Sequence, residues 1–274
     1  MSLFTREVTV VALSSGSAGN CTWIGDKHAG VLIDCGLSTK RILERIEATG
    51  LSDMPIDAVL ITHEHGDHVG AARVLSRALA KRGKPVPFFM TRGTAGAIHP
   101  TSVPEGIEHI GAGESFKLKH LQIEPIPVPH DTVEPCAFRV RVGDVTAAVI
   151  TDLGKQTNLV SRHLRECDIA ILEFNHDEDM LMDGPYPWHL KQRIRGSHGH
   201  LSNVQAARLL TESLGEKLRH LVLAHLSEEN NTPAKAMMAA RGALKAAGAA
   251  DRVHVHVALQ HAALAPVRVT ASAW

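Results

Sequence analysis

The chain has 274 residues, 44% of them hydrophobic, so it is long enough and apolar enough to bury a substantial core. Its 29 basic and 29 acidic residues cancel, which excludes nucleic-acid binding through overall charge and leaves that task to a local basic patch. Four scattered cysteines without a C-x-x-C pair predict reduced thiols in a cytoplasmic protein. We see no signal-peptide pattern and no apolar run of membrane-spanning length, so no membrane attachment is expected.

The first hundred residues alternate between apolar runs, which predict buried strands, and amphipathic stretches, which predict helices. Strands are expected at residues 8–13, 21–24, 31–33, 58–61 and 86–90. Ser38 and Thr91 are placed to cap helices. The helices are expected from Ser38 to about residue 48, over 69–80, and over 95–98.

From residue 107 to 149 the pattern changes to β-type alternation, which predicts a second, antiparallel sheet. Its strands are expected at 107–110, 115–118, 121–128, 136–142 and 145–150, with a hairpin turn at Gly143-Asp144. Later strands are expected at 168–172, 221–224 and 253–257, and later helices at 176–182, 188–194, 203–213 and 233–247. No linker, low-complexity segment or repeat interrupts the chain, so we expect one domain over residues 1–274.

The segment Thr62-His63-Glu64-His65-Gly66-Asp67-His68 gathers metal-ligand side chains between an expected strand and an expected helix. Ligands bind at such strand ends in α/β layers. Imidazole and carboxylate groups suit divalent ions of the zinc, manganese or iron type. His63 and His65 could hold one ion, while Asp67 and His68 could reach a second.

Two other interpretations of this segment compete with a metal site. Asp67 alone could be an N-cap that accepts a hydrogen bond from a helix N–H. The zinc-protease helix H-E-x-x-H begins correctly at His63-Glu64 but needs histidine where Asp67 stands. Four ligand-type side chains in this spacing favour the metal site. Asp34, at the end of the third strand, could orient a ligand histidine or serve only as a turn acid.

The pattern H-x-H-x-D-H resembles the signature of the metallo-β-lactamase superfamily of binuclear metallohydrolases. The resemblance implies an α/β (α+β) fold, the four-layer αβ/βα sandwich with two metals at one edge between the sheets. The flavodiiron branch has glutamate where this chain has His65, which disfavours a diiron oxygen or nitric oxide reductase.

Three more ligand-type residues each follow an apolar run, namely His130, Asp152 and His225. The resemblance implies two ligand groups that share Asp152: His63, His65 and His130 for one ion, and Asp67, His68 and His225 for the other. Two divalent ions ~3.5–4 Å apart can share a hydroxide at neutral pH, and this hydroxide would be the nucleophile. Covalent catalysis by serine or cysteine is then not required.

A basic strip beside Tyr186 and Trp188 is the candidate nucleic-acid surface. Its members are His189, Lys191, Arg193, Arg195, His198 and His200. Cations bind backbone phosphates and aromatic rings stack on bases, although a solvated helix face beside two core aromatics is the competing interpretation. Ser17 and Asn20 lie in a turn of small residues that could present backbone N–H groups to a phosphate or could simply be a tight hairpin connection.

The element Gly199-His200-Leu201-Ser202 resembles tRNase Z-type enzymes, in which the histidine stabilises or protonates the scissile phosphate. An N-terminal cap role competes for His200, although Ser202 suits that role equally. With the motifs S-G-S-x-G-N, E-F-N-H-D, G-P-Y-P-W and H-L-S-E-E-N-N, the chain resembles the YycJ (WalJ) subgroup of cytoplasmic DNA exonucleases. The chain has no counterpart of the tRNase Z exosite arm, and no inserted β-CASP domain separates Asp152 from His225. Both departures count against tRNA processing and against an Artemis-like nuclease.

We therefore expect a cytoplasmic metal-dependent hydrolase, a DNA exonuclease with two zinc, manganese or iron ions and with Asp67 and His200 as catalytic residues. Candidate substrate-binding residues are Ser17, Asn20, Lys191, Arg193, Arg195 and His198. The alternative is a small-molecule metallohydrolase, either a cyclic phosphodiesterase or a thioesterase, which predicts a closed pocket. A β-lactamase is disfavoured by the missing secretion signal, and a non-enzymatic relative by the complete ligand set.

Overall fold

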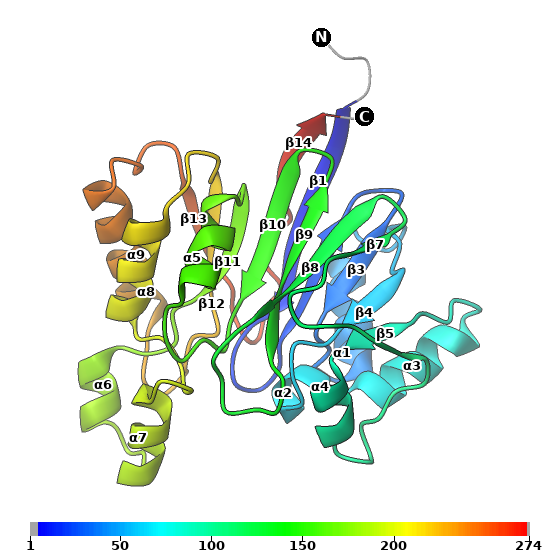
Figure 1. Ribbon diagram of the computed structural model, residues 1–274, viewed down its shortest axis with the longest axis horizontal. Coiled ribbons are helices and arrows are strands. Elements are labelled where there is room, and N and C mark those ends of the chain that lie inside the picture. Colours follow the sequence, from blue (N-terminus) through cyan, green and yellow to red (C-terminus); the bar gives the residue numbers. More distant parts are fainter. Residues whose placement is uncertain (1–4, 273–274) are drawn as a thin grey trace. The chain divides into compact units, whose positions relative to one another are not determined.

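The computed structural model describes residues 5–272, whose strands form two seven-stranded sheets (Figure 1). The chain divides into two compact units. Unit 1 comprises the chain up to Pro127, Thr132–Thr146 and the chain from Gln260 onwards, whereas unit 2 comprises Val128–Asp131 and Ala147–Leu259. Among the residues that the structure describes, no helix is long and apolar enough to cross a membrane.

The first sheet belongs to unit 1 and is mixed. Its strands are β1 (Thr5–Ser14), β2 (Cys21–Gly25), β3 (Gly30–Ile33), β4 (Ala58–Leu60), β5 (Phe88–Met90), β6 (Ile107–His109) and β14 (Val267–Ser272). Their order is β14-β1-β2-β3-β4-β5-β6, with parallel pairing from β3 to β6. The prediction that β6 joins the second sheet was wrong, because Ile107 packs against the core of the first. Strand β14 was not predicted.

The helices of unit 1 are α1 (Thr39–Ala48), α2 (Gly66–Val69), α3 (Ala72–Lys81) and α4 (Arg92–Ala97). Ser38 and Thr91 cap α1 and α4 as predicted, each accepting a backbone N–H three residues on. The helix predicted over residues 69–80 is divided, because the N–H of Ala71 donates to the carbonyl of Cys35 instead of continuing a helix. This division makes α2 a single short helix that carries Asp67 and His68.

The second sheet contains the remaining strands. They are β7 (Phe116–Leu118), β8 (Leu121–Pro127), β9 (Cys136–Val142), β10 (Val145–Ile150), β11 (Ile169–Glu173), β12 (His220–Ala224) and β13 (His254–Val257), in the order β13-β12-β11-β10-β9-β8-β7. The predicted antiparallel pairing is confirmed for β7, β8 and β9. Strands β10 to β13 are parallel, however, so the carboxyl ends of β10, β11 and β12 meet at one edge.

The helices of unit 2 are α5 (Asn158–Arg165), α6 (Glu178–Asp183), α7 (Trp188–Arg195), α8 (Asn203–Ser213) and α9 (Pro233–Ala246). Helices α5, α8 and α9 lie side by side along the parallel strands (Figure 1). Helix α5 was not predicted. Helix α7 contains no buried residue and is therefore not part of the core.

Candidate metal centre

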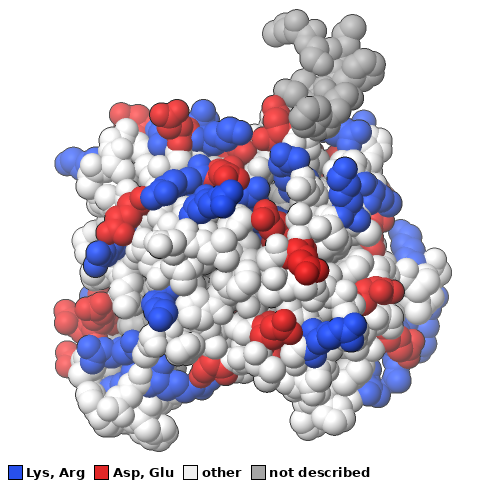
Figure 2. Space-filling view, viewed as in Figure 1, with Lys and Arg blue, Asp and Glu red and all other residues white. Residues whose placement is uncertain are grey.

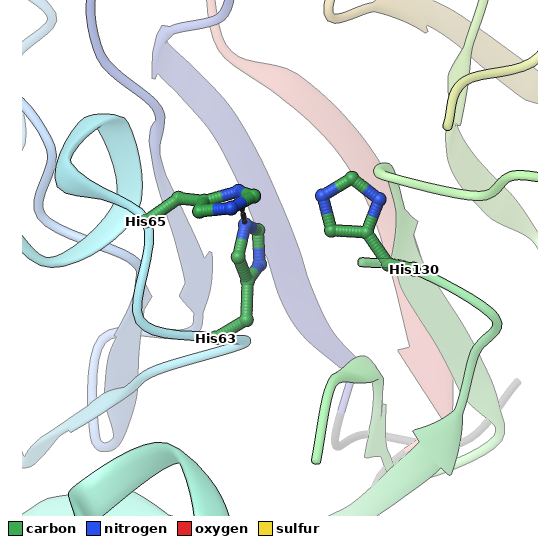
Figure 3. Close-up of side chains that lie close together, drawn as sticks. All are labelled: His63, His65 and His130. Atoms are coloured by element: carbon green, nitrogen blue, oxygen red, sulfur yellow. Dashed lines mark hydrogen bonds between the residues drawn. The ribbon is translucent and has the colours of Figure 1, made fainter. Parts of the chain in front are cut away.

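His63 and His65 present two ring nitrogens to one point just beyond β4. The Nε2 atom of His63 lies 3.1 Å from the Nδ1 atom of His65 (Figure 3). The two rings meet edge to face, with centroids 4.8 Å apart. Zinc–nitrogen bonds of ~2.0–2.1 Å bring two ligand nitrogens to about this separation. This pair within unit 1 is therefore suited to one divalent ion.

Asp34 orients the neighbouring ligand candidate His68. The Nδ1 atom of His68 lies 2.8 Å from Oδ2 of Asp34, and both side chains are buried. Thr62 also donates its hydroxyl to Asp34 and lies 2.9 Å from Nδ1 of His63. Burial raises the pKa of the Asp34 carboxyl, and the His68 ring acts in the opposite direction. Because Asp34 holds Nδ1, the Nε2 atom of His68 faces Asp67 and Asn20, which supports the expectation that Asp34 orients this ring.

Asp67 is not the N-cap of α2. That position is His65, and Asp67 lies in the first turn with its Oδ2 atom 3.4 Å from Nε2 of His68. The side-chain amide of Asn20 lies 3.3 Å from the same Oδ2 atom and 3.1 Å from Nε2 of His68. A side chain at Gly36 would strike the carbonyl of Asp67, so only glycine allows this backbone approach. Asp67 and His68 form the second donor pair of unit 1.

Asp152 lies between two histidines of unit 2. Its Oδ1 atom is 3.7 Å from Nε2 of His130 and 3.6 Å from Nε2 of His225. His130, also drawn in Figure 3, directs its Nδ1 atom to the carbonyl of Gly199, so its Nε2 atom faces the carboxylates of Asp131 and Asp152. Burial lowers the pKa of His130, although Asp152 opposes the effect. Asp152 and His225 have left-handed backbones, with φ of 57° and 55°, and lie two residues and one residue after the ends of β10 and β12.

Glu173, the last residue of β11, is the central acceptor of unit 2 and was not among the predicted site residues. Its Oε1 atom lies 2.8 Å from Nδ1 of His200 and 3.1 Å from Nδ1 of His225. Its Oε2 atom accepts the backbone N–H groups of Leu153 and Leu201. Burial raises the pKa of Glu173, but the His200 ring and the hydrogen bonds from both histidines outweigh it, so the net pKa is lowered. An ionised carboxylate thus fixes both rings.

His200 does not cap α8. Ser202 is the N-cap, and it forms a capping box with Gln205. Because Glu173 holds the Nδ1 atom of His200, the ring presents its Nε2 atom, and the side chain is 20% exposed. The cap interpretation of His200 was therefore wrong, and the ring is positioned by a buried acid instead.

The donor chemistry fits divalent metals. Ligand-type atoms of Asp152, Glu173, His200 and His225 all lie within 4.8 Å of one another in unit 2. Four of the five predicted ligand histidines have Nδ1 beside a side-chain oxygen or a carbonyl, as metal-binding histidines normally do: His63, His68, His130 and His225. Mixed imidazole and carboxylate donors select zinc, manganese or iron over magnesium or calcium.

The predicted substrate-binding residues differ from one another in their exposure and in their contacts within the protein. Lys191 donates to the carbonyl of Met182 at 2.6 Å, Arg195 contacts the Met182 sulfur, and Arg193 pairs with Asp131. His198 and Ser17 are exposed, whereas Asn20 is buried against the metal-ligand segment. Figure 2 shows basic atoms interspersed with acidic ones on the face drawn. The basic strip is thus accessible but partly engaged within the protein.

Comparison with known proteins identifies the family. The model of the beta-lactamase superfamily domain matches residues 30–226. The chain belongs to the metallo-β-lactamase superfamily. Within that superfamily it is 34% identical over 224 residues to the exodeoxyribonuclease WalJ of Streptococcus pneumoniae serotype 2, covering 80% of this chain and 81% of WalJ. It is 29% identical over 249 residues to the exodeoxyribonuclease YycJ of Bacillus anthracis, covering 89% and 92% of the two chains.

A solved structure shares the superfamily fold. The metallo-β-lactamase fold protein YhfI of Bacillus subtilis aligns with a TM-score of 0.70 and 16% identity, over 94% of this chain and 99% of YhfI. The predicted α/β sandwich class and the predicted YycJ-like subgroup are both confirmed. The match to the family model includes all seven predicted ligand residues, which lie between His63 and His225.

Proposed function

We propose that this protein is a metal-dependent exonuclease that hydrolyses phosphodiester bonds of DNA in the cytoplasm. The 34% identity to WalJ over most of both chains supports the activity and the substrate class. All four cysteines are buried and none forms a disulfide, as expected in a reducing compartment. Burial also raises the pKa of the Cys21, Cys35 and Cys136 thiols, so none of them is activated as a nucleophile.

The proposed centre takes two divalent ions, zinc or manganese being the first choice. Asp152 would serve both ions, because its Oδ1 atom lies within 3.7 Å of the ring nitrogens of His130 and His225. The remaining ligands would form two groups: His63, His65 and His130, and Asp67, His68 and His225. When bound, the ions would supply an activated water and neutralise charge on the attacked phosphate.

The observation that carries the proposal is the Glu173–His200 pair. The 2.8 Å contact between the buried Glu173 carboxylate and Nδ1 fixes the orientation of the His200 ring, and the side chain is 20% exposed, so its Nε2 atom is suited to pass a proton to a bound substrate. Cleavage of a phosphodiester leaves an alkoxide that needs this proton. Asp67, whose side chain is 22% exposed, is suited to hold the proton lost by the attacking water. His200 would thus donate a proton from Nε2, and Asp67 would accept one on its carboxylate.

Nucleic acid would reach this centre along α7 and the loop after it. Lys191 and Arg195 donate to the carbonyl and the sulfur of Met182, which are uncharged groups, so these two cations are suited to bind backbone phosphates. Trp188, at the start of α7, is 57% exposed and offers a face on which a base can stack. Ser17 and His198 are exposed as well, and they remain proposed substrate contacts.

The test is an activity assay with manganese or zinc on 5′-labelled duplex DNA, the matching RNA and bis-p-nitrophenyl phosphate. We expect stepwise shortening of DNA, and loss of at least two orders of magnitude in turnover for His200→Ala with metal content retained. His109→Ala, an exposed histidine on β6, is the matched control and should keep full turnover. Hydrolysis of the small diester alone, with DNA left intact, would contradict the nuclease and favour the small-molecule metallohydrolase.

A further inference from the structure

Three histidines cluster at the β12–β13 edge of unit 2, apart from the candidate metal centre. His254 and His256 stand two residues apart on β13, so their side chains leave the same face of that edge strand. His220 begins β12 and is paired in register with His254. The centroid of the His220 ring lies 5.3 Å from that of His254 and 5.4 Å from that of His256. One face of the sheet edge thus carries three neighbouring imidazoles.

Two nitrogens of this cluster already have the spacing of ligands to one ion. The Nδ1 atom of His220 lies 3.1 Å from the Nε2 atom of His256. Two nitrogens bound at ~2.0–2.1 Å are ~2.9 Å apart at a right angle and ~3.3 Å apart at the tetrahedral angle. The observed separation lies between these values. His254 is exposed, so its ring can turn toward the same point with only a loss of side-chain freedom.

The chemistry of the cluster also suits a metal. Burial lowers the pKa of His220 to about 4, and the rings of His256 and His254 act in the same direction. Burial and the His254 ring likewise lower the pKa of His256. Both shifts favour the uncharged imidazole, which is the form that binds metals. Imidazole nitrogens select zinc, nickel and copper, whereas calcium and magnesium prefer oxygen ligands.

We propose that His220, His254 and His256 form a separate binding site for a divalent ion of the zinc, nickel and copper class. The ion ties β13 to β12 at the open edge of the sheet, and water completes its coordination. Strand β13 carries none of the predicted ligands of the nuclease centre. On β12, His220 is the first residue, whereas His225 follows the opposite end of the strand. This site is therefore independent of the proposed nuclease activity.

The test measures zinc bound per chain in the holoenzyme, by equilibrium dialysis and elemental analysis. The wild type and the control His109→Gln should hold one more zinc ion per chain than His220→Asn or His256→Gln. His254→Gln should bind this ion at least tenfold more weakly. Zinc should also raise the Tm of the wild type more than that of His256→Gln, and circular dichroism before dialysis verifies that each variant is folded.

Asp152→Ala separates this site from the candidate metal centre. That variant should lose ions at the centre and still hold the additional zinc ion. Equal zinc content in the wild type, His220→Asn and His256→Gln would overturn the inference. Full metal content in Asp152→Ala would instead contradict the proposed binuclear centre and leave the histidine site standing.

Discussion

Replacing Glu173 by glutamine should disable two histidines at once. One oxygen of the carboxylate accepts hydrogen bonds from the Nδ1–H groups of His200 and His225. The other oxygen accepts from the backbone N–H groups of Leu153 and Leu201. Glutamine has one oxygen, which can accept from only one of these donor pairs, and one NH₂ group, which is itself a donor. Either the two histidines or the two backbone N–H groups must then face the NH₂ group. If the rings yield, their protons move to Nε2, and His225 loses the nitrogen that would bind a metal.

The magnitude follows from the two hydrogen bonds between the rings and the carboxylate. Hydrogen bonds to a charged group contribute ~1.5–3 kcal/mol each, so ~3–6 kcal/mol is at stake. At ~1.4 kcal/mol per tenfold change, kcat/KM on 5′-labelled duplex DNA should fall ~10²–10⁴-fold. Metal affinity, measured by competition with a chelator, should fall ~10–100-fold.

Glu178→Gln is the control for this substitution. Glu178 accepts the hydroxyl of Ser202 at 2.7 Å and is exposed, and glutamine keeps that acceptor. Its kcat/KM should stay within about twofold of the wild type, because a surface substitution of this kind changes little. A Glu173→Gln protein with less than a tenfold loss in kcat/KM and unchanged metal affinity would refute the reasoning and leave Glu173 as a structural acceptor only.

Three further outcomes are expected. Asp152→Ala should lower the metal content and abolish DNA hydrolysis, and two ions per chain with normal turnover would contradict the shared ligand. Lys191→Gln and Arg195→Gln should each weaken DNA binding and reduce the slope of log K against log salt by ~1, with bis-p-nitrophenyl phosphate hydrolysis unchanged. Burial lowers the pKa of His176 to about 4, below its unfolded value of ~6.5, so its contribution to stability is present above pH ~6.5 and lost as the pH falls toward 4. We expect the free energy of unfolding of the metal-free wild type to fall with decreasing pH in that window. For His176→Gln this fall should be smaller by up to ~1.4 kcal/mol per pH unit, as measured by urea unfolding.

Local patterns predicted the elements that position the site. The apolar run before His63 is β4, and α8 has the predicted bounds, because Ser202 and Gln205 mark its start unambiguously. The pairing of the strands was harder to predict from the sequence. Strand β6 shows the same alternation as its sequence neighbours. Its pairing with β5 and the packing of the partly buried Ile107 place it in the first sheet. Pairing depends on contacts distant in sequence, which periodicity does not record.

The functional residues divide in the same way. His63, His65, Asp67 and His68 are close in sequence, so their spacing alone predicted a donor cluster. Glu173 also ends an apolar strand, yet a single acid at that position usually lies at the surface, and only its complete burial between two histidines reveals its role. Local sequence therefore indicated the donors, whereas the buried acid that orients them emerged only from the fold.

The left-handed backbones at Asp152 and His225 place a limit on how stable this protein can become. Such a conformation costs an L-residue ~1–2 kcal/mol, and glycine would remove that cost. Glycine would also remove the carboxylate or the imidazole that the turn holds in place. At these two positions the stability of the fold favours glycine, whereas the chemistry of the site requires aspartate or histidine. The chain therefore keeps backbone strain at both positions in exchange for these two side chains.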